Sequence, residues 1–502
     1  MELTSLLALM VAGFIAAPRM VVALSSGDAP AMYEAYNNAF LYTSGSTAYY
    51  KKSSNVSEED GSWTEDLDIN VVLDAYENTG DGDKLALIND LLTTWLSYNP
   101  PPWNADGWND DVGWYTLALI RAYQYTGTTD FLNQAQAGYD MAFARGWDTA
   151  HNGGGIWELQ PEDDSSPANK CILSNNSLGR VACLIYQSTN NATYLDQCTQ
   201  IYDWVWRNLY VPSTGEVYGC IEQDGTIDYG DDPYNQGSMA DMANMLWLIN
   251  NDESFLNDAK LAISYAFSNV TVKGIFSNTS PSTVGWTDDL TRAVGRTVSN
   301  NRLWDTYYSS MVDNADAIVQ NKRADLGITW NGWDTPTPDD TSLQTTQAAG
   351  AAAWLWWVPA SQPNDTAGLH VITNQQTGLA IDSMGTYGSG QSVNQWQTTG
   401  SQNQRWLLSQ NSDASWNIVS TSTWQALDCP GGSTTQNLSM IQWQPTRASN
   451  QRWLIDQQSN GTYKIWNQQS GLALDGSSST GNGSPLTQAA YNGGPQQLWF
   501  LQ

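Results

Sequence analysis

The sequence predicts an all-α domain followed by an all-β domain, and three observations indicate this division. Pairs of helix-like segments recur between residues 66 and 358. A short segment rich in Pro, Asn and Ser follows at 359–367 and is typical of a linker. Beyond it, a unit rich in Gln, Ser and Gly with short β-like runs recurs three times. A chain of 502 residues is long enough for two or three hydrophobic cores, so we expect each part to pack separately.

The helical part repeats a pair of unlike helices. An apolar helix that ends in a polar turn, as in 115–127, is followed by an amphipathic one, as in 131–145. A helix that is apolar nearly all round is buried on most sides, whereas an amphipathic helix covers a core with one face. We therefore expect an (α/α)6 barrel over residues 24–358, with an open array of hairpins as the alternative. A helix around 29–46 would close the ring by pairing with the helix at 341–357.

The C-terminal part consists of three similar β-units. Each ends in a Q-x-W sequence, and the tryptophans Trp406, Trp453 and Trp499 lie 47 and 46 residues apart. One such unit cannot bury its own apolar face, but three units around a pseudo-threefold axis can. The Q-x-W repeats resemble ricin-B-type β-trefoil lectins (carbohydrate-binding family 13), and the resemblance covers residues 368–502. We assign the three tryptophans to the core and give them no ligand role.

The lectin resemblance implies one shallow sugar pocket in each unit. In such a pocket an Asp accepts hydrogen bonds from sugar hydroxyls, and an aromatic ring further along the chain stacks on the sugar. The residues assigned to sugar binding on this basis are Asp382, Asn394, Trp396 and Asn403 in the first unit and Asp428, Trp443 and Asn450 in the second. Ile441 replaces the polar residue that corresponds to Asn394, which weakens the second pocket. The third unit has Ala489 where the ring belongs, so we expect it not to bind sugar unless Tyr491 substitutes.

Charge and aromatic content restrict the partners. The net charge is −31, from 51 acidic and 20 basic residues, and a field of this sign repels nucleic acids, anionic membranes and anionic polysaccharides. The chain has 25 Trp and 24 Tyr but only 8 Phe, and Trp and Tyr combine a flat apolar face with a polar edge that suits sugar rings. We expect the partner to be a neutral polysaccharide.

The N-terminus indicates export. The apolar run at 5–17 is too short for a comfortable membrane span but has the length of a signal-peptide core, and Val21 and Ala23 would allow cleavage after Ala23. We therefore expect a signal peptide over residues 1–23, no membrane span, and a secreted, extracellular or cell-wall-associated monomer. Nine N-x-S/T sequences agree with this location, at Asn55, Asn175, Asn191, Asn269, Asn278, Asn364, Asn437, Asn460 and Asn482.

The cysteines favour disulfides over a metal site. Cys171, Cys183, Cys198 and Cys220 can form two disulfides, and the sequence leaves their pairing open. Cys429 stands alone in the β-domain as a candidate free, buried thiol. No C-x-x-C spacing occurs and the chain has two His residues, so we expect neither a metal nor a cofactor.

The candidate catalytic residues are two consecutive aspartates. Asp110 and Asp111 stand directly before an apolar inner helix and are flanked by Trp103, Trp108 and Trp114. Aspartate at a helix start is commonly a cap. Four further Asp-Asp pairs occur elsewhere in the chain, so the dipeptide alone does not indicate a catalytic site. The aromatic surroundings set this pair apart. Adjacent, partly desolvated carboxyls have their pKa values pushed apart, as an acid and a nucleophile require, and a separation near ~5 Å would favour retention of configuration.

The pair lies in a segment that resembles glycoside hydrolase family 76, which includes endo-α-1,6-mannanases. The matching pieces are DGWNDDVGWYTLALIRAYQYTG (106–127), GGGIWELQ (153–160), NKCILSN (169–175) and PYNQG (233–237). The resemblance implies an (α/α)6 fold and a retaining double displacement, with Asp110 as nucleophile and Asp111 as acid/base. It also implies five candidate substrate contacts, which are Trp114, Trp157, Asn175, Tyr234 and Asn235.

The resemblances together imply a secreted enzyme that cleaves internal α-1,6-mannosidic bonds. Its lectin domain would hold it on α-mannan or on galactose-containing glycans. Three alternatives stay open: a transglycosylase of cell-wall mannan, an (α/α)6 glycosidase of another specificity, and a non-catalytic lectin with a degenerate barrel. The net charge of −31 argues against uronic-acid polymers as substrates.

Overall fold

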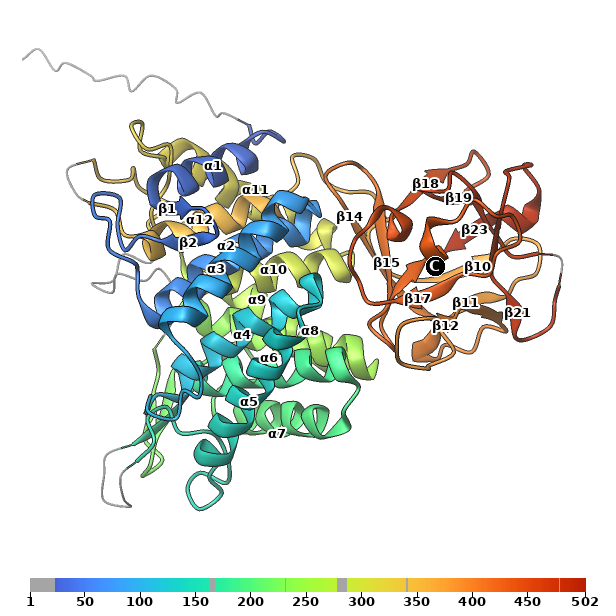
Figure 1. Cartoon of the computed structure of the whole chain (residues 1–502). Coiled ribbons are helices and arrows are strands. Elements are labelled where there is room, and N and C mark those ends of the chain that lie inside the picture. The colour runs from blue at the N-terminus through green and yellow to red at the C-terminus, as the bar shows by residue number, and fades with distance from the viewer. Residues whose placement is uncertain (1–22, 162–167, 231, 278–286, 340–341, 478) are drawn as a thin grey trace, which may run out of the picture.

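The computed structural model places a helical domain beside a β-domain (Figure 1). It describes residues 23–161, 168–230, 232–277, 287–339, 342–477 and 479–502. Residues 1–22 of the expected signal peptide lie outside the described residues. Within the described part of the chain, no helix combines the length and apolar character needed to cross a membrane.

The helical domain is a closed ring of helical hairpins. Each inner helix contacts the next inner helix, and the last contacts the first, so the prediction of an (α/α)6 barrel is confirmed. The inner helices are α2 (Ser62–Thr79), α4 (Asn109–Thr126), α6 (Ile172–Thr189), α8 (Pro233–Asn250), α10 (Thr287–Asn300) and α12 (Thr345–Trp357). The outer helices are α1 (Asp28–Phe40), α3 (Gly82–Tyr98), α5 (Thr129–Gly146), α7 (Ala192–Asn208), α9 (Glu253–Asn269) and α11 (Trp304–Asn321).

The N-terminal helix α1 packs against α12 and completes the sixth pair, as predicted. The expected extent of this helix, 29–46, was wrong at its C-terminal end. The chain leaves the helix at Phe40 and forms a hairpin of β1 (Leu41–Ser44) and β2 (Thr47–Tyr50). Thr and Tyr favour strands, and Gly45 takes the left-handed φ of 63° that the tight turn requires.

All inner helices run in the same direction, which gives the barrel two different ends. Each of the first four pairs turns through a left-handed Gly or Asn, as at Gly80 (φ 63°) and Asn190 (φ 57°), before the outer helix begins. Neighbouring inner helices approach closely: a Cβ added at Gly113 would lie 2.1 Å from Ser177 Oγ. The N-terminal ends of the inner helices, including that of α4, therefore lie together at one end of the ring.

Short β-elements lie at the end of the barrel that carries the N-termini of the inner helices. They are the three-stranded sheet of β3 (Asn169–Cys171), β6 (Cys220–Glu222) and β7 (Ile227–Asp228), and the pairs β4 (Tyr210–Val211) with β5 (Glu216–Val217) and β8 (Thr271–Val272) with β9 (Ile275–Phe276). A disulfide between Cys171 and Cys220 joins β3 to β6, and a second between Cys183 and Cys198 joins α6 to α7. Cys429 is a buried free thiol, as predicted.

The β-domain is a trefoil of three units around its own core. Its strands are β10 (Gly368–Asn374), β11 (Ala380–Asp382), β12 (Gln391–Ser392), β13 (Asn394–Trp396), β14 (Arg405–Gln410), β15 (Trp416–Ser420), β16 (Ala426–Asp428), β17 (Ile441–Trp443), β18 (Trp453–Gln457), β19 (Tyr463–Asn467), β20 (Ala473–Asp475), β21 (Ser484–Pro485), β22 (Thr487–Ala489) and β23 (Leu498–Leu501). Trp406, Trp453 and Trp499 are fully buried, and each indole N–H donates to a backbone carbonyl of the equivalent strand. The tryptophans are therefore core residues, as expected.

The trefoil sits on the C-terminal ends of the inner helices (Figure 1). Arg447 donates to the carbonyl of Glu77 at 2.8 Å, and Arg452 donates to the carbonyl of Gly80 at 2.6 Å. The guanidinium of Arg405 lies 4.6 Å from the ring centre of Trp247. The lectin-like domain thus caps the end of the barrel that lies opposite the Asp110–Asp111 pair.

Candidate active site

The candidate active site is built on the first turn of α4. Asn109 fixes this turn: its Nδ2 donates to the carbonyl of Trp157 at 2.7 Å, and its Oδ1 accepts from Arg145 Nε at 2.7 Å. Arg145 also donates to the carbonyl of Asp106 at 2.6 Å. A buried amide and a guanidinium therefore hold the loop that leads into α4. Asp110 and Asp111 follow immediately, at the N-terminal end of α4, where the helix dipole is positive.

Burial and like charges raise the pKa of both aspartates. Burial raises the pKa of Asp110 to about 6, with a contribution from Asp106, although backbone N–H groups of the helix start oppose the shift. Burial and then Asp110 and Asp106 raise the pKa of Asp111 to about 8. Among the described residues, neither carboxyl forms an ion pair with Lys, Arg or His. Near neutral pH the pair therefore holds one carboxylate and one carboxylic acid.

Two further carboxyls join this cluster from distant segments. Asp66, the fifth residue of α2, is fully buried with no hydrogen-bond partner on either carboxyl oxygen, and burial and Asp111 hold its pKa well above the ordinary value. Glu158 lies on the segment whose backbone accepts from the N–H of Asn109 at 2.8 Å. Burial and then Asp110 and Asp111 raise the pKa of Glu158 to about 8. Sequence reasoning missed both residues, because only the closed ring brings them to α4.

The five expected substrate contacts surround the pair but lie within the wall of the barrel. The exposed fractions are 1% for Trp114, 4% for Trp157, 0% for Asn175, 1% for Tyr234 and 4% for Asn235. The rings of Trp114 and Tyr234 meet edge to face at 5.2 Å between ring centres. These side chains therefore form a buried layer below the site. A ligand that approaches from solvent meets more exposed side chains first.

The two expected amide contacts are occupied by backbone. Asn175 accepts from the N–H of Ile156 at 2.8 Å and donates to the carbonyl of Cys171 at 2.8 Å, which ties the 153–158 segment to α6. Asn235 donates to the carbonyl of Gly230 at 2.8 Å. Both amides satisfy buried peptide groups, and this explains why polar residues occur at these positions.

Exposed aromatic rings lie above this wall. Trp108, the residue before α4, is 45% exposed, and Tyr229, between β7 and α8, is 62% exposed. Tyr229 meets Tyr218 edge to face at 4.7 Å between ring centres. Exposed Trp and Tyr rings on the face that carries the carboxyl cluster offer flat surfaces to a sugar chain. The sequence analysis used Trp108 as part of the aromatic surroundings without assigning it a ligand role.

One compact group of potential metal ligands exists among the described residues, and it consists of Glu158, Cys171 and Cys220. Its two sulfurs are joined in a disulfide, so neither is a thiolate that could bind a metal. The disulfide instead anchors β3 and β6 beside the Glu158 carboxyl, whose Oε2 lies 4.0 Å from Cys220 Sγ.

The trefoil places its candidate sugar residues on matching strand pairs. Asp382 lies opposite Asn394, and Asp428 lies opposite Ile441. In the second unit Asn450 and Gln451 each donate to Asp428 at 2.9 Å. In the first unit Asn403 instead accepts from Ser422, and Gln404 donates to Asp382 at 3.1 Å.

The stacking rings differ between the three units. Trp443 is 44% exposed and Trp396 is half-buried, so both rings present a surface. In the third unit Ala489 provides no ring, and Tyr491 lies 4.6 Å from the Lys464 ammonium. Tyr491 is 43% exposed, and this cation–π contact covers part of the ring that could have substituted.

The fold and the carboxyl cluster define an (α/α)6 barrel of the glycosidase type joined to a trefoil of the lectin type. Residues 30–336 match the model of glycosyl hydrolase family 76, and segments 350–443, 402–489 and 449–502 match the ricin-type β-trefoil lectin domain. The first match covers more than half of the chain. The protein therefore belongs to glycosyl hydrolase family 76 and carries a C-terminal ricin-type lectin domain.

Known proteins resemble parts of the chain. A putative mannan endo-1,6-α-mannosidase of Schizosaccharomyces pombe is 29% identical over 152 residues, which are 28% of this chain and 34% of that protein. The mannan endo-1,6-α-mannosidase DFG5 of Saccharomyces cerevisiae is 30% identical over 125 residues, 23% of this chain and 27% of that protein. The chain thus matches about a third or less of the length of these curated relatives.

The barrel also resembles solved structures. The α-1,6-mannanase of a Salegentibacter species is 23% identical with a TM-score of 0.59, and the match covers 66% of this chain and 98% of that one. A variant of the Salegentibacter enzyme, inactive after replacement of two consecutive aspartates, was solved in complex with α-1,6-mannotetrose. At this identity the likeness demonstrates the shared fold.

Proposed function

We propose that the protein is a secreted, retaining endo-α-1,6-mannosidase that its lectin domain targets to glycans. The observation that carries the proposal is the unpaired Asp110–Asp111 carboxyl pair at the start of an inner barrel helix, with pKa values of about 6 and about 8. The Salegentibacter mannanase, which shares the fold, is inactive when two consecutive aspartates are replaced. Both curated relatives carry the name of the same activity.

The two pKa values assign the roles within the proposed mechanism. Asp110, with the lower pKa, is ionised near neutral pH and attacks the anomeric carbon as the nucleophile, so that a glycosyl-enzyme ester forms. Asp111, with the higher pKa, donates its proton to the departing glycosidic oxygen. In the second step Asp111 takes a proton from water, which attacks the same carbon and releases Asp110. A sugar hydroxyl in place of water would give transglycosylation by the same steps.

The surroundings support a neutral sugar chain as the substrate. Trp108 and Tyr229 offer exposed rings on the face that carries the carboxyls, and the cluster of acidic groups repels an anionic polymer. Trp114, Trp157, Asn175, Tyr234 and Asn235 act from below as positioning residues. In the trefoil, the pockets of Asp382 with Trp396 and of Asp428 with Trp443 would raise the local concentration of substrate for the barrel.

The test is the release of reducing ends from debranched α-1,6-mannan. The parent protein should release them, and the Asp110→Asn and Asp111→Asn variants should not. Asp130→Asn serves as the matched control, because Asp130 also begins a helix, α5, but is exposed and lies outside the carboxyl cluster. Initial products of the same anomeric configuration as the substrate would support retention, and products longer than the substrate would favour the transglycosylase alternative. A folded parent that binds mannan but yields neither kind of product would support the non-catalytic lectin.

A further inference from the structure

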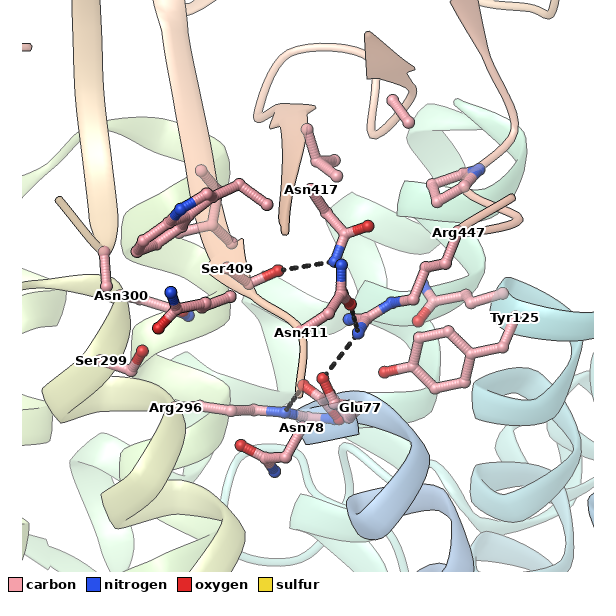
Figure 2. Close-up of a pocket in the computed structure, with 18 of the residues that line it drawn as sticks. Glu77, Asn78, Tyr125, Arg296, Ser299, Asn300, Ser409, Asn411, Asn417 and Arg447 are labelled. Atoms are coloured by element: carbon pink, nitrogen blue, oxygen red, sulfur yellow. Dashed lines mark hydrogen bonds and ion pairs between the residues drawn. The ribbon is translucent and has the colours of Figure 1, made fainter. Parts of the chain in front are cut away.

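A large cavity lies between the two domains, far from the carboxyl cluster. Its volume is about 930 Å³, and it is lined by the C-terminal ends of inner helices on one side and by the trefoil on the other. This volume is within the range of roughly 300–1,000 Å³ that small-molecule sites occupy. Figure 2 shows Glu77 and Arg296 of the barrel facing Asn411, Asn417 and Arg447 of the trefoil across it. We refer to this cavity as the junction site.

The first and second trefoil units both contribute residues to the junction site, and the second departs there from its two sister units. Trp424, which lines the cavity, has a left-handed backbone with φ 55°. The equivalent positions in the other units are Gly378 and Gly471, with φ of 71° and 68°. A bulky residue in this conformation is rare and costs roughly 1 kcal/mol or more, whereas glycine adopts it freely. The second unit therefore retains a strained tryptophan at the position that meets the barrel, where its ring packs against the helical core.

Several buried polar atoms of the cavity wall have no partner. Asn417 is 3% exposed, and its Nδ2 donates to Asn411 at 2.9 Å while its Oδ1 accepts no hydrogen bond. The indole N–H groups of Trp304, Trp357 and Trp424 also lack an acceptor, and the first two residues are 6% and 7% exposed. Buried donors and acceptors are normally satisfied, so unpartnered polar atoms on several residues that line one cavity indicate a bound polar ligand.

The charged groups of the wall are already paired with each other. Arg296 donates to the Glu77 carboxylate at 2.9 Å, and Arg447 donates to the carbonyl of Glu77 at 2.8 Å. Burial acts against ionisation of Glu77, but Arg296 and Arg121 hold its pKa below the ordinary value. The groups left without a partner are the neutral Asn417 amide oxygen and indole N–H groups, together with one oxygen of the buried Asp241 carboxyl, whose other oxygen lies 3.5 Å from Arg296. This chemistry suits a neutral polyhydroxyl ligand rather than an anion.

We propose that the junction site binds a short neutral oligosaccharide, which stacks on Trp424 and hydrogen-bonds to Asn417 and to the indole N–H groups. The sugar can come from two sources. One is free oligosaccharide from the surroundings. The other is an N-linked glycan of the chain itself, because Asn364 lines the cavity, is exposed and begins an N-D-T sequence. The junction site lies at the opposite end of the barrel from the carboxyl cluster, and none of the residues assigned to the two lectin pockets lines it. It adjoins the second pocket, because Gln451 of its wall donates to Asp428 at 2.9 Å.

The experiment uses the full chain with the Asp110→Asn, Trp396→Ala and Trp443→Ala changes, which remove activity and the lectin stacking rings. Hydrogen–deuterium exchange is measured with and without α-1,6-mannotriose, and affinity is measured by calorimetry. We expect the sugar to protect the 405–425 segment. Adding Trp424→Gly should abolish this protection and weaken the corresponding binding by about tenfold or more. The backbone accepts glycine at this position, as the sister units show, but the change also removes the packing of the Trp424 ring against the helical core. A thermal melt without sugar therefore accompanies the binding measurement, which is made at a temperature where both proteins are folded.

A matched pair of proteins with and without Asn364→Gln separates the two sources of the sugar. Protection of 405–425 in both proteins identifies a site for free sugar. Protection only after Asn364→Gln shows that the chain's own glycan occupies the site otherwise. Protection in neither protein, or unchanged mannotriose binding at this segment in Trp424→Gly, would overturn the proposal. Protection confined to the 106–111 and 153–158 segments would also overturn it and would leave the proposed activity intact.

Discussion

Two pairs of consecutive aspartates occupy the same place in the barrel but have opposite environments. Asp110–Asp111 lie in the first turn of α4, and Asp288–Asp289 lie in the first turn of α10, so both pairs meet the free N–H groups of an inner helix. Asp289 receives two hydrogen bonds from Arg180, at 2.9 and 3.0 Å, and a further one from Arg292. No such cation pairs with Asp110 or Asp111 among the described residues.

The difference in partners produces a difference in ionisation. Burial acts to raise the pKa of Asp289, but Arg180 and Arg292 lower it below the ordinary value. Burial without a cation raises the pKa of Asp110 to about 6. The first environment fixes a permanent charge and links α6 to α10, whereas the second leaves carboxyls that exchange protons near neutral pH. The partner of an aspartate pair, and not its position on a helix, therefore separates a structural pair from a candidate catalytic one.

The largest expected effect is the loss of activity when Asp110, of the aspartate pair without a cation partner, is replaced. Replacing Asp110 by Asn removes the proposed nucleophile, and we expect turnover on α-1,6-mannan to fall by roughly 10⁴-fold or more. The melting temperature should stay the same or rise, because the change removes a buried carboxylate that has no cation beside it. Parallel activity assays and thermal melts measure both effects. A variant that melts at a lower temperature and keeps its turnover would reverse the assignment of the two pairs.

The paired site should show the opposite behaviour. Asp289→Asn removes the buried carboxylate that Arg180 and Arg292 share, while Asp74 still pairs with Arg292 at 2.9 Å and Asp241 still lies 3.7 Å from Arg180. We expect the free energy of unfolding to fall by about 3 kcal/mol, the lower end of the range for a broken buried ion pair. Asp288→Asn is the matched control, since burial and Asp289 raise the pKa of Asp288 to about 7 and one of its carboxyl oxygens has no partner. Denaturant unfolding should separate the two variants. Equal losses of stability would show that the arginines contribute little.

The sequence predicted the fold because both domains repeat. The alternation of buried and amphipathic helices indicates a ring, and the Q-x-W spacing indicates a trefoil, since a single repeat can bury its apolar face only against its neighbours. The disulfide pairing stayed open at that stage because it depends on which elements meet. Cys171 reaches Cys220 only because β3 pairs with β6.

The site was predicted in part. Asp110 and Asp111 were found because aromatic residues surround them in the sequence itself. Asp66 and Glu158 were missed because they come from α2 and from the 153–158 segment, and nothing local marks them. Sequence alone also gives no depth of burial. Trp114, which resembles a surface contact in the sequence, proved to be 1% exposed and packed against another buried ring.

The pH dependence of activity and stability should distinguish Asp110–Asp111, which have no cation beside them, from two aspartates on an ordinary surface. Activity should follow a bell-shaped curve with limbs near pH 6 and pH 8, from the ionisation of Asp110 and the protonation of Asp111. Both pKa values exceed the ordinary value, so the folded chain binds more protons than the unfolded chain between about pH 4 and pH 8. The pair therefore makes the fold less stable as the pH rises through this window. Thermal melts should show Asp111→Asn gaining on the parent between about pH 5 and pH 8, and a constant difference would contradict the raised pKa.

The smallest effect should come from replacing Asp106, which helps to raise the pKa values of Asp110 and Asp111. Asp106 contributes to the shifts of Asp110 and Asp111, so Asp106→Asn should move both limbs of the activity curve to lower pH by about half a unit. Asp106 also accepts from the Tyr115 hydroxyl at 3.0 Å, and a change in loop geometry could imitate a change in charge. Tyr115→Phe removes this hydrogen bond and keeps the charge, so it should leave the limbs in place. If the two variants move the limbs equally, the loop geometry rather than the Asp106 charge tunes the pair.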